Sequence, residues 1–159
     1  MFHYCLSIRI YNVNFRAVVN VSQVFVKKLT AEGRKGSVVN FSTGLTKVTA
    51  PLISAWSSMY AAVDHLTRNM AVELAPANIR VNAINLGAVL TQMMAEASEE
   101  QARKYGDRYR IEDMLKRVQT PNKTVDMDDI INTVLFLLSD AAGALIGNTV
   151  VVDGGYSIA

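Results

Sequence analysis

The alternation of hydrophobic and polar positions is clearest in the first half of the chain. Residues 37–42 form a short run rich in β-branched side chains that opens into a turn at Gly44, which is typical of a strand and its exit. From residue 56 to residue 74, apolar side chains recur every three or four positions, as in an amphipathic helix. A second strand is predicted directly afterwards, at residues 79–85. This order predicts a parallel βαβ unit, in which reactive side chains gather beyond the carboxyl ends of the strands.

Helical spacing also appears on either side of this unit. Residues 13–29 carry apolar side chains in a pattern that predicts a largely buried helix. After the second strand, Thr91 is placed to cap a helix that runs towards Lys104. The polar segment 96–117 is expected to form two short helices broken near Gly106, as a rim over one end of the sheet.

The carboxyl-terminal part is expected to add one helix and one strand. After a turn around Pro121, either Thr124 or Asp126 begins the helix, and aspartates in its first turn suit the positive end of the helix dipole. Residues 147–153 form the last predicted strand. The side chains of the helix predicted to face the core are Ile130, Ile131, Val134, Leu135 and Leu138.

The three predicted strands are rich in apolar residues, as parallel strands covered on both faces must be. A doubly wound sheet usually has more than three strands. We therefore predict an α/β fold with an incomplete, doubly wound parallel sheet. At 159 residues the chain fits a single domain, residues 1–159.

Composition and charge argue against several classes of function. The net charge of +2 and the scattered Lys and Arg residues argue against nucleic acid as a partner. No apolar run reaches the roughly 18 residues that a membrane span needs. The single cysteine, Cys5, excludes an internal disulfide, and the separation of His3 from His65 gives no sign of a metal site. Because residues 1–8 also lack the features of a secretory signal, we expect a cytoplasmic protein.

Seven short motifs follow one another along about residues 12–157. They are Asn14-Phe-Arg-Ala, Ser37-Val-Val-Asn-Phe-Ser-Thr43, Ala61-Ala-Val-Asp-His-Leu-Thr67, Met70-Ala-Val-Glu-Leu74, Ile79-Arg-Val-Asn-Ala-Ile-Asn85, Phe136-Leu-Leu-Ser-Asp140 and Val152-Asp-Gly-Gly155. Taken together and in this order, the motifs resemble the short-chain dehydrogenase/reductase family. The resemblance implies a Rossmann-like fold and, through the family's carbonyl and L-xylulose reductase members, reduction of a small carbonyl substrate by NADP(H).

Two features of the family have no counterpart in the sequence. Its Gly-rich loop, whose backbone N–H groups hold the cofactor pyrophosphate at a helix start, does not occur, and its Asn-Asn-Ala-Gly segment is also lacking. The chain therefore resembles the carboxyl-terminal part of a reductase, and we expect the amino-terminal nucleotide-binding half of the Rossmann-like sheet to be missing.

The resemblance also locates the family's catalytic positions. Trp56 lies at the position of the proton-donating tyrosine, and Tyr60 at that of the lysine that lowers the tyrosine pKa and holds the nicotinamide ribose. Thr43 matches the serine that orients the substrate carbonyl, and Asn14 matches the asparagine that supports a proton relay. On the cofactor side, the resemblance places Asn85, Gly87 and Thr91 near the nicotinamide end.

The substituted residues weaken the chemistry that the resemblance implies. The indole N–H of Trp56 donates a hydrogen bond but does not ionise usefully, so packing is the favoured interpretation of this residue. Tyr60 lies one turn further on, yet a phenol with no ammonium beside it is a weak acid catalyst near neutral pH. Thr43 retains a hydroxyl that could orient a carbonyl or cap a turn. For Asn14, a structural hydrogen bond is favoured over a relay.

Two hypotheses about function therefore stand. The chain is an NADPH-dependent carbonyl reductase by descent, catalytically impaired as sequenced, or it is a non-catalytic remnant that acts as an oligomerisation or binding module. Under either hypothesis a homo-oligomer is expected, because the central helices carry more apolar surface than three strands can cover.

Overall fold

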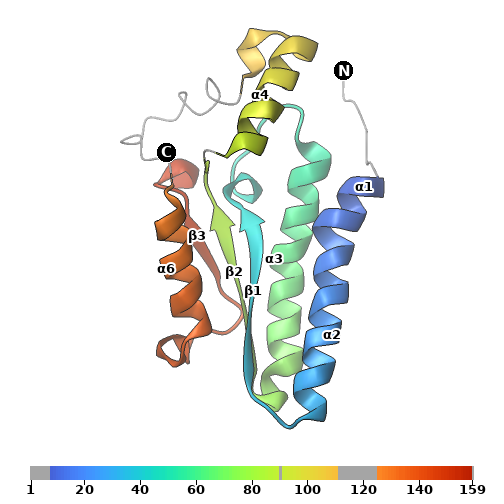
Figure 1. Cartoon of the computed structure of the whole chain (residues 1–159), viewed down its shortest axis with the longest axis vertical. Helices are drawn as coiled ribbons and strands as arrows, with labels where there is room; N and C mark the ends of the chain where they lie inside the picture. The colour runs from blue at the N-terminus through green and yellow to red at the C-terminus, as the bar shows by residue number, and fades with distance from the viewer. Residues whose placement is uncertain (1–7, 90, 111–124, 159) are drawn as a thin grey trace.

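The sheet of the protein has three parallel strands in the order β1-β2-β3 (Figure 1). They are β1 (Gly36–Thr43), β2 (Ile79–Leu86) and β3 (Thr149–Val152). The computed structural model describes residues 8–89, 91–110 and 125–158. The first pair runs in unbroken register from Gly36 opposite Ile79 to Thr43 opposite Leu86. The parallel βαβ unit predicted from the sequence is confirmed.

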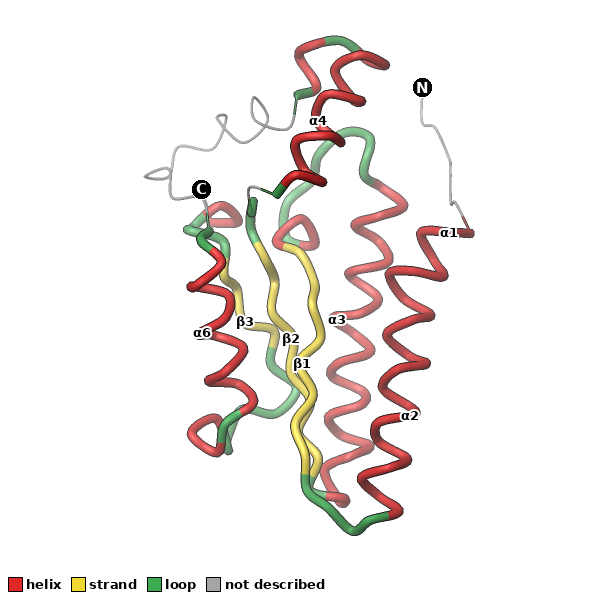
Figure 2. Tube along the Cα trace, viewed as in Figure 1, coloured by secondary structure: helices red, strands yellow, loops and turns green. Residues whose placement is uncertain are grey.

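One face of the sheet is covered by α3 (Ser54–Leu74), which crosses from β1 to β2. Figure 2 shows this helix running back along the strands before β2 begins. Its Met70 and Ala71 pack with Val81 of β2 in a buried cluster. The amphipathic spacing of residues 56–74 thus identified both the helix and its buried side.

A second helical segment runs alongside α3 (Figure 1) and consists of α1 (Ile8–Tyr11), a π-helix (Asn12–Arg16) and α2 (Ala17–Ala31). The prediction that this segment is largely buried was wrong. Only Ser22 and Leu29 of α2 are buried, and Val24 is 73% exposed. The physical reason is that α2 meets the sheet at β1, while the apolar side chains of its outer side, Val21, Val24 and Phe25, are exposed in the described part of the chain.

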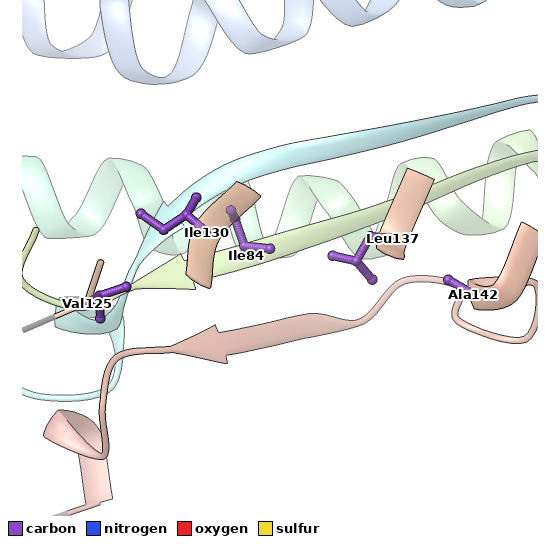
Figure 3. Close-up of a cluster of buried hydrophobic side chains, with 5 residues drawn as sticks. All are labelled: Ile84, Val125, Ile130, Leu137 and Ala142. Atoms are coloured by element: carbon purple, nitrogen blue, oxygen red, sulfur yellow. The ribbon is translucent and has the colours of Figure 1, made fainter. Parts of the chain in front are cut away.

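The opposite face of the sheet is covered by α6 (Met127–Leu138). Figure 3 shows Ile130 and Leu137 of this helix beside Ile84 of β2, within a buried cluster completed by Val125 and Ala142. The predicted core face was wrong in part, because Leu137 is buried whereas three of the predicted members are exposed. Those three are Ile131, Leu135 and Leu138.

The amino end of α6 begins as the sequence predicted. Asp126 is the N-cap residue, and its backbone N–H donates to the carboxylate of Asp129 at 3.2 Å. Asp128 and Asp129 lie in the first turn, where acidic groups favour the helix dipole. The alternative start at Thr124 and the turn at Pro121 lie outside the described residues.

The carboxyl end of α6 is fixed to β2 by Arg80. Its guanidinium donates to the carbonyl oxygens of Leu137 at 3.0 Å, Ser139 at 2.9 Å and Ala142 at 3.1 Å. Leu137 lies in the last turn of α6, whose carbonyls have no partner inside the helix, and Ser139 and Ala142 follow it in the chain. The planar guanidinium joins these three carbonyls and places a positive charge at the negative end of the helix dipole.

Beyond the sheet, α4 (Gln92–Tyr105) follows Thr91, whose hydroxyl accepts a hydrogen bond from the Met94 N–H at 3.2 Å. The predicted cap is therefore confirmed. The helix ends at Gly106, which has a φ of 100°, and a short 3₁₀ turn, Asp107–Tyr109, follows. The rest of the second predicted rim helix, residues 111–117, lies outside the described residues.

Among the described helices, none is both long and apolar enough to cross a membrane. The cytoplasmic location stays a prediction.

Candidate functional site

The candidate site lies beyond the carboxyl end of β1, where the amino-terminal half of α3 faces the π-helix. Three of the residues predicted from the family positions meet there: Trp56 and Tyr60 of α3, and Asn14 of the π-helix. Crossover connections in parallel sheets bring side chains from distant parts of the chain to this end of the strands.

Trp56 and Tyr60 contact each other directly. Their ring centroids are 4.8 Å apart, and the ring planes meet at 66°, an edge-to-face arrangement. The two residues are four positions apart on one helix, so their side chains share a face. Edge-to-face aromatic pairs add roughly 0.5–1.5 kcal/mol beyond the area they bury, which supports the packing role predicted for Trp56.

The hydroxyl of Tyr60 donates a hydrogen bond to the side-chain oxygen of Asn14 at 3.0 Å. The amide nitrogen of Asn14 donates in turn to the backbone carbonyl of Ile10 at 2.9 Å. Both ends of the Asn14 amide are therefore satisfied, as a partly buried polar side chain requires. The residue lies within the π-helix Asn12–Arg16, an irregular turn that the hydrophobic pattern does not predict.

Burial raises the pKa of the Tyr60 hydroxyl above its ordinary value of 10.0. Desolvation disfavours the phenolate, and the hydrogen-bond partner is a neutral amide rather than an ammonium group. The shift is opposite in direction to the one that a general acid needs for work near neutral pH.

Thr43, the last residue of β1, belongs to a different set of contacts. Its hydroxyl oxygen accepts a hydrogen bond from the Leu45 N–H at 3.3 Å and so holds the short 3₁₀ turn Gly44–Thr46. The side chain is 7% exposed. This hydrogen bond supports the interpretation that Thr43 caps the turn. A role of its hydroxyl in orienting a substrate carbonyl stays a prediction.

Beneath this turn lies a buried polar group that the sequence analysis missed. The Asp64 carboxylate accepts hydrogen bonds from the Thr46 hydroxyl at 3.1 Å and from the Asn85 amide at 3.4 Å. Asn85 also donates to the Thr46 oxygen at 2.9 Å. The available signal was a charged residue four positions after Tyr60, on the core side of α3.

The three residues predicted to contact the cofactor are all engaged within the protein. The amide nitrogen of Asn85 is held by Thr46 and Asp64, and Thr91 caps α4. Gly87 approaches Asp153 so closely that an added Cβ would stand 2.6 Å from its Cα. This contact requires glycine and joins the exit of β2 to that of β3.

A hollow of about 540 Å³ lies between α6 and β3, away from Trp56 and Tyr60. Its walls include Asp129, Asn132 and Asp153. None of the predicted site residues lines it. His65, as expected, is exposed, and its Nδ1 lies 3.2 Å from the Arg68 guanidinium. Within the described part of the chain, no three His, Cys, Asp or Glu side chains come together in a way that could hold a metal.

Comparison with known proteins gives a consistent result. Residues 8–157 match the family model described as enoyl-(acyl carrier protein) reductase. Carbonyl reductase [NADPH] 2 of Sus scrofa is 38% identical over 93% of this chain and 57% of its own length. L-xylulose reductase of Homo sapiens is 37% identical over 93% of this chain and likewise 57% of its own length. The chain thus spans little more than half the length of these curated relatives.

The solved structures agree on the fold. A sorbitol-6-phosphate 2-dehydrogenase from Erwinia amylovora matches with a TM-score of 0.82 and 25% identity, covering 98% of this chain and 61% of that one.

Proposed function

This chain belongs to the short-chain dehydrogenase/reductase family, and within it we propose a descendant of NADPH-dependent carbonyl reductases that is catalytically impaired as it stands. The substrate class of its ancestry is a small ketone or α-dicarbonyl, as the names of the carbonyl and L-xylulose reductases indicate.

The observation that carries the proposal is the hydrogen bond from the Tyr60 hydroxyl to the neutral amide of Asn14. Reduction of a carbonyl needs a proton at the carbonyl oxygen, from a group whose pKa lies near the working pH. Trp56 cannot supply that proton, because an indole N–H does not ionise in this range. Tyr60 holds its proton more tightly than a free tyrosine, since burial raises its pKa.

The fit of the described residues to NADP(H), which would supply the hydride when bound, is also poor. The Asn85 amide nitrogen and the Thr91 hydroxyl already form hydrogen bonds within the protein, and Gly87 packs directly against Asp153. Tyr60 offers no positive charge for a ribose. We therefore derive no cofactor-dependent step for this chain.

The alternative function, a non-catalytic oligomerisation or binding module, is supported by a specific observation. Apolar side chains are exposed along the outer side of α2, namely Val21, Val24 and Phe25. Contiguous apolar surface of this kind commonly marks a contact with another protein. Both functions are compatible with an impaired catalytic centre.

A chimera tests the proposal. Residues 8–157 would replace the matching segment of the pig carbonyl reductase, and NADPH oxidation would be followed with a small α-dicarbonyl. We expect background activity from this chimera. Restoring an ionisable pair with Trp56→Tyr and Tyr60→Lys should raise the rate by about 10²–10⁴-fold, the usual contribution of a matched acid.

The two single variants are the matched controls, since each supplies half of the pair and should stay near background. Turnover by the unsubstituted chimera within tenfold of the intact pig enzyme would show that Trp56, Tyr60 and Thr43 suffice, and the proposal of impairment would fall.

A further inference from the structure

A second hollow, of about 370 Å³, lies at the amino ends of β1 and β2. Its walls are formed by the entry of β1 at residues 35–37, the entry of β2 at residues 78–80, and residues between 138 and 146 at the end of α6 and after it. Figure 1 shows the loop between α2 and β1 at the end of the molecule opposite α4. A hollow of this size falls within the range of small-molecule sites, about 300–1,000 Å³.

Two cationic side chains, Lys35 and Arg80, line this hollow. The guanidinium of Arg80 donates two hydrogen bonds through Nη1 and one through Nη2 to the carbonyl oxygens at the end of α6. Because a guanidinium has five N–H donors, the Nε–H and one N–H of Nη2 have no partner in the described part of the chain. The hollow therefore offers positive charge together with unused hydrogen-bond donors.

A single acidic side chain, that of Asp140, is found among the described residues that line the hollow. Its carboxylate lies 3.1 Å from the Lys35 ammonium, and the two side chains are 92% and 74% exposed. Ion pairs as exposed as this one are weak, because water solvates both charges. An anion with more charge than a carboxylate can therefore take the place of Asp140 at Lys35.

We propose that this hollow binds the phosphate group of a small phosphate monoester. Such a group carries a charge of about −1.5 to −2 at pH 7 and presents three acceptor oxygens. Its charge matches the two cations once Lys35 is released from Asp140, and its oxygens match the unused N–H groups of Arg80 and Lys35. A carboxylate brings one charge and two oxygens, so it complements the same donors less completely.

The proposed site is separate from the candidate catalytic residues. Trp56 and Tyr60 lie beyond the carboxyl end of β1, whereas the hollow lies where β1 and β2 begin. None of the residues that line it belongs to the candidate site. Binding of a phosphate monoester here therefore does not depend on whether the chain reduces a carbonyl or binds NADP(H).

The test uses the complete chain, with glycerol 3-phosphate as the probe and glycerol as the uncharged control ligand. A titration followed by NMR should show saturable shifts of backbone amides in residues 35–37, 78–80 and 140–143. The indole N–H of Trp56, the single tryptophan of the chain, should not shift, because it lies at the other end of the strands. Glycerol should cause no comparable shifts at any of these positions.

Three variants at exposed positions test the roles of the charges. Lys35→Gln should weaken binding by about tenfold or more, because it removes a charge-assisted hydrogen bond. Lys104→Gln makes the same change on α4, away from the hollow, and should leave binding within twofold. Asp140→Asn should strengthen binding by about two- to fivefold, since it removes the carboxylate that competes for Lys35. Circular dichroism checks that all three variants are folded.

Any of four results would overturn the inference. The first is no saturable binding of glycerol 3-phosphate at millimolar concentration in low salt. The second is binding that Lys35→Gln leaves within twofold of the parent protein, or that Asp140→Asn weakens. The third is a set of shifts centred on Trp56, which would place the probe in the candidate catalytic site. The fourth is tighter binding of succinate than of glycerol 3-phosphate, which would make the hollow a carboxylate site.

Discussion

At the residue scale, the contacts of Tyr60 limit the chemistry that its side chain can perform. The family resemblance places a lysine at its position. In the structure its hydroxyl donates a hydrogen bond to Asn14, and its ring packs against Trp56. Burial raises the pKa of Tyr60, and the hydrogen bond that its hydroxyl donates also requires the protonated phenol. Because Trp56 is the single tryptophan of the chain, its fluorescence reports directly on this site.

The first prediction concerns pH. The folded-state pKa of Tyr60 lies above the unfolded value of about 10, so above that pH the unfolded chain releases this proton first. Stability should therefore fall as the pH rises from about 10 through the folded pKa, and be fully present below that window. Urea denaturation at pH 9 and pH 11, followed by Trp56 fluorescence, measures the difference.

Tyr60→Phe should show a smaller loss of stability between the two pH values, since phenylalanine does not titrate. Tyr105→Phe is the control for removing a tyrosine hydroxyl elsewhere. Equal losses in the parent protein and in Tyr60→Phe would contradict the assignment of the pH dependence to Tyr60.

A second prediction at this scale concerns Arg80. Arg80→Lys keeps the charge but cannot bond three carbonyls with a planar fork, so we expect a loss of about 1.5–3 kcal/mol in the free energy of unfolding. Asp140→Asn, which removes an exposed ion pair with Lys35, should cost less than about 1 kcal/mol. Chemical denaturation of both variants compares them, and equal effects would argue against a stabilising role of the Arg80 hydrogen bonds at the carboxyl end of α6.

Sequence reasoning placed Asn14, Trp56 and Tyr60 through family spacing, but it could not supply their contacts. The π-helix that aims Asn14 at Tyr60 leaves no pattern in residues 12–16. Asp64 was missed because its partners, Thr46 and Asn85, lie 18 and 21 residues away in sequence. Contacts between elements depend on the packing of the elements, which periodicity does not give.

At the scale of elements, α6 has one side that is buried against the sheet and another that is exposed to solvent. Leu137→Ala should cost about 2–5 kcal/mol, because it opens a cavity beneath the sheet. Leu135→Ala removes the same atoms at a site that is 60% exposed, and should change stability by less than about 1 kcal/mol. Thermal or urea unfolding of the pair tests the burial pattern; a costly Leu135→Ala would show that its flank is already covered.

The strands and helices themselves were predictable, and their buried sides only in part. Period and turn residues located β1, α3 and β2 to within two residues, and Thr91 identified the start of α4. In α2 and α6, however, the apolar arc is wider than the surface that covers it. A sequence shows that a side chain is apolar but not which neighbour it meets.

At the scale of the whole molecule, we predict weak binding of NADPH. The sequence contains no Gly-x-Gly-x-x-Gly motif, and the Asn85 amide nitrogen and the Thr91 hydroxyl form hydrogen bonds within the protein. Lack of two charge-assisted hydrogen bonds, each worth roughly 1.5–3 kcal/mol, already weakens binding about a hundredfold or more. Titration calorimetry with the pig enzyme as positive control measures it, and a micromolar dissociation constant would refute the prediction.

Self-association is the last prediction. The family resemblance implies that the apolar faces of residues 18–26 and 63–70 meet their counterparts in a second copy across a two-fold axis. In the second of these ranges, Val63 and Met70 are buried in the core. The surface that the structure leaves open is the outer side of α2. Sedimentation velocity should show a concentration-dependent oligomer that Phe25→Lys shifts to monomer, whereas Met93→Lys on α4 does not. A monomer at all concentrations would contradict it.

The order of the strands in the sheet also determines when each pair can form during synthesis of the chain. Thr149 pairs with Ala83 but follows it by 66 residues, whereas β1 and β2 are complete much earlier. At about 5–20 residues per second, the ribosome would take roughly 3–13 seconds between the two partners. During that interval the future central strand is itself an edge. The nascent chain is therefore most vulnerable to mispairing before its last strand has been translated.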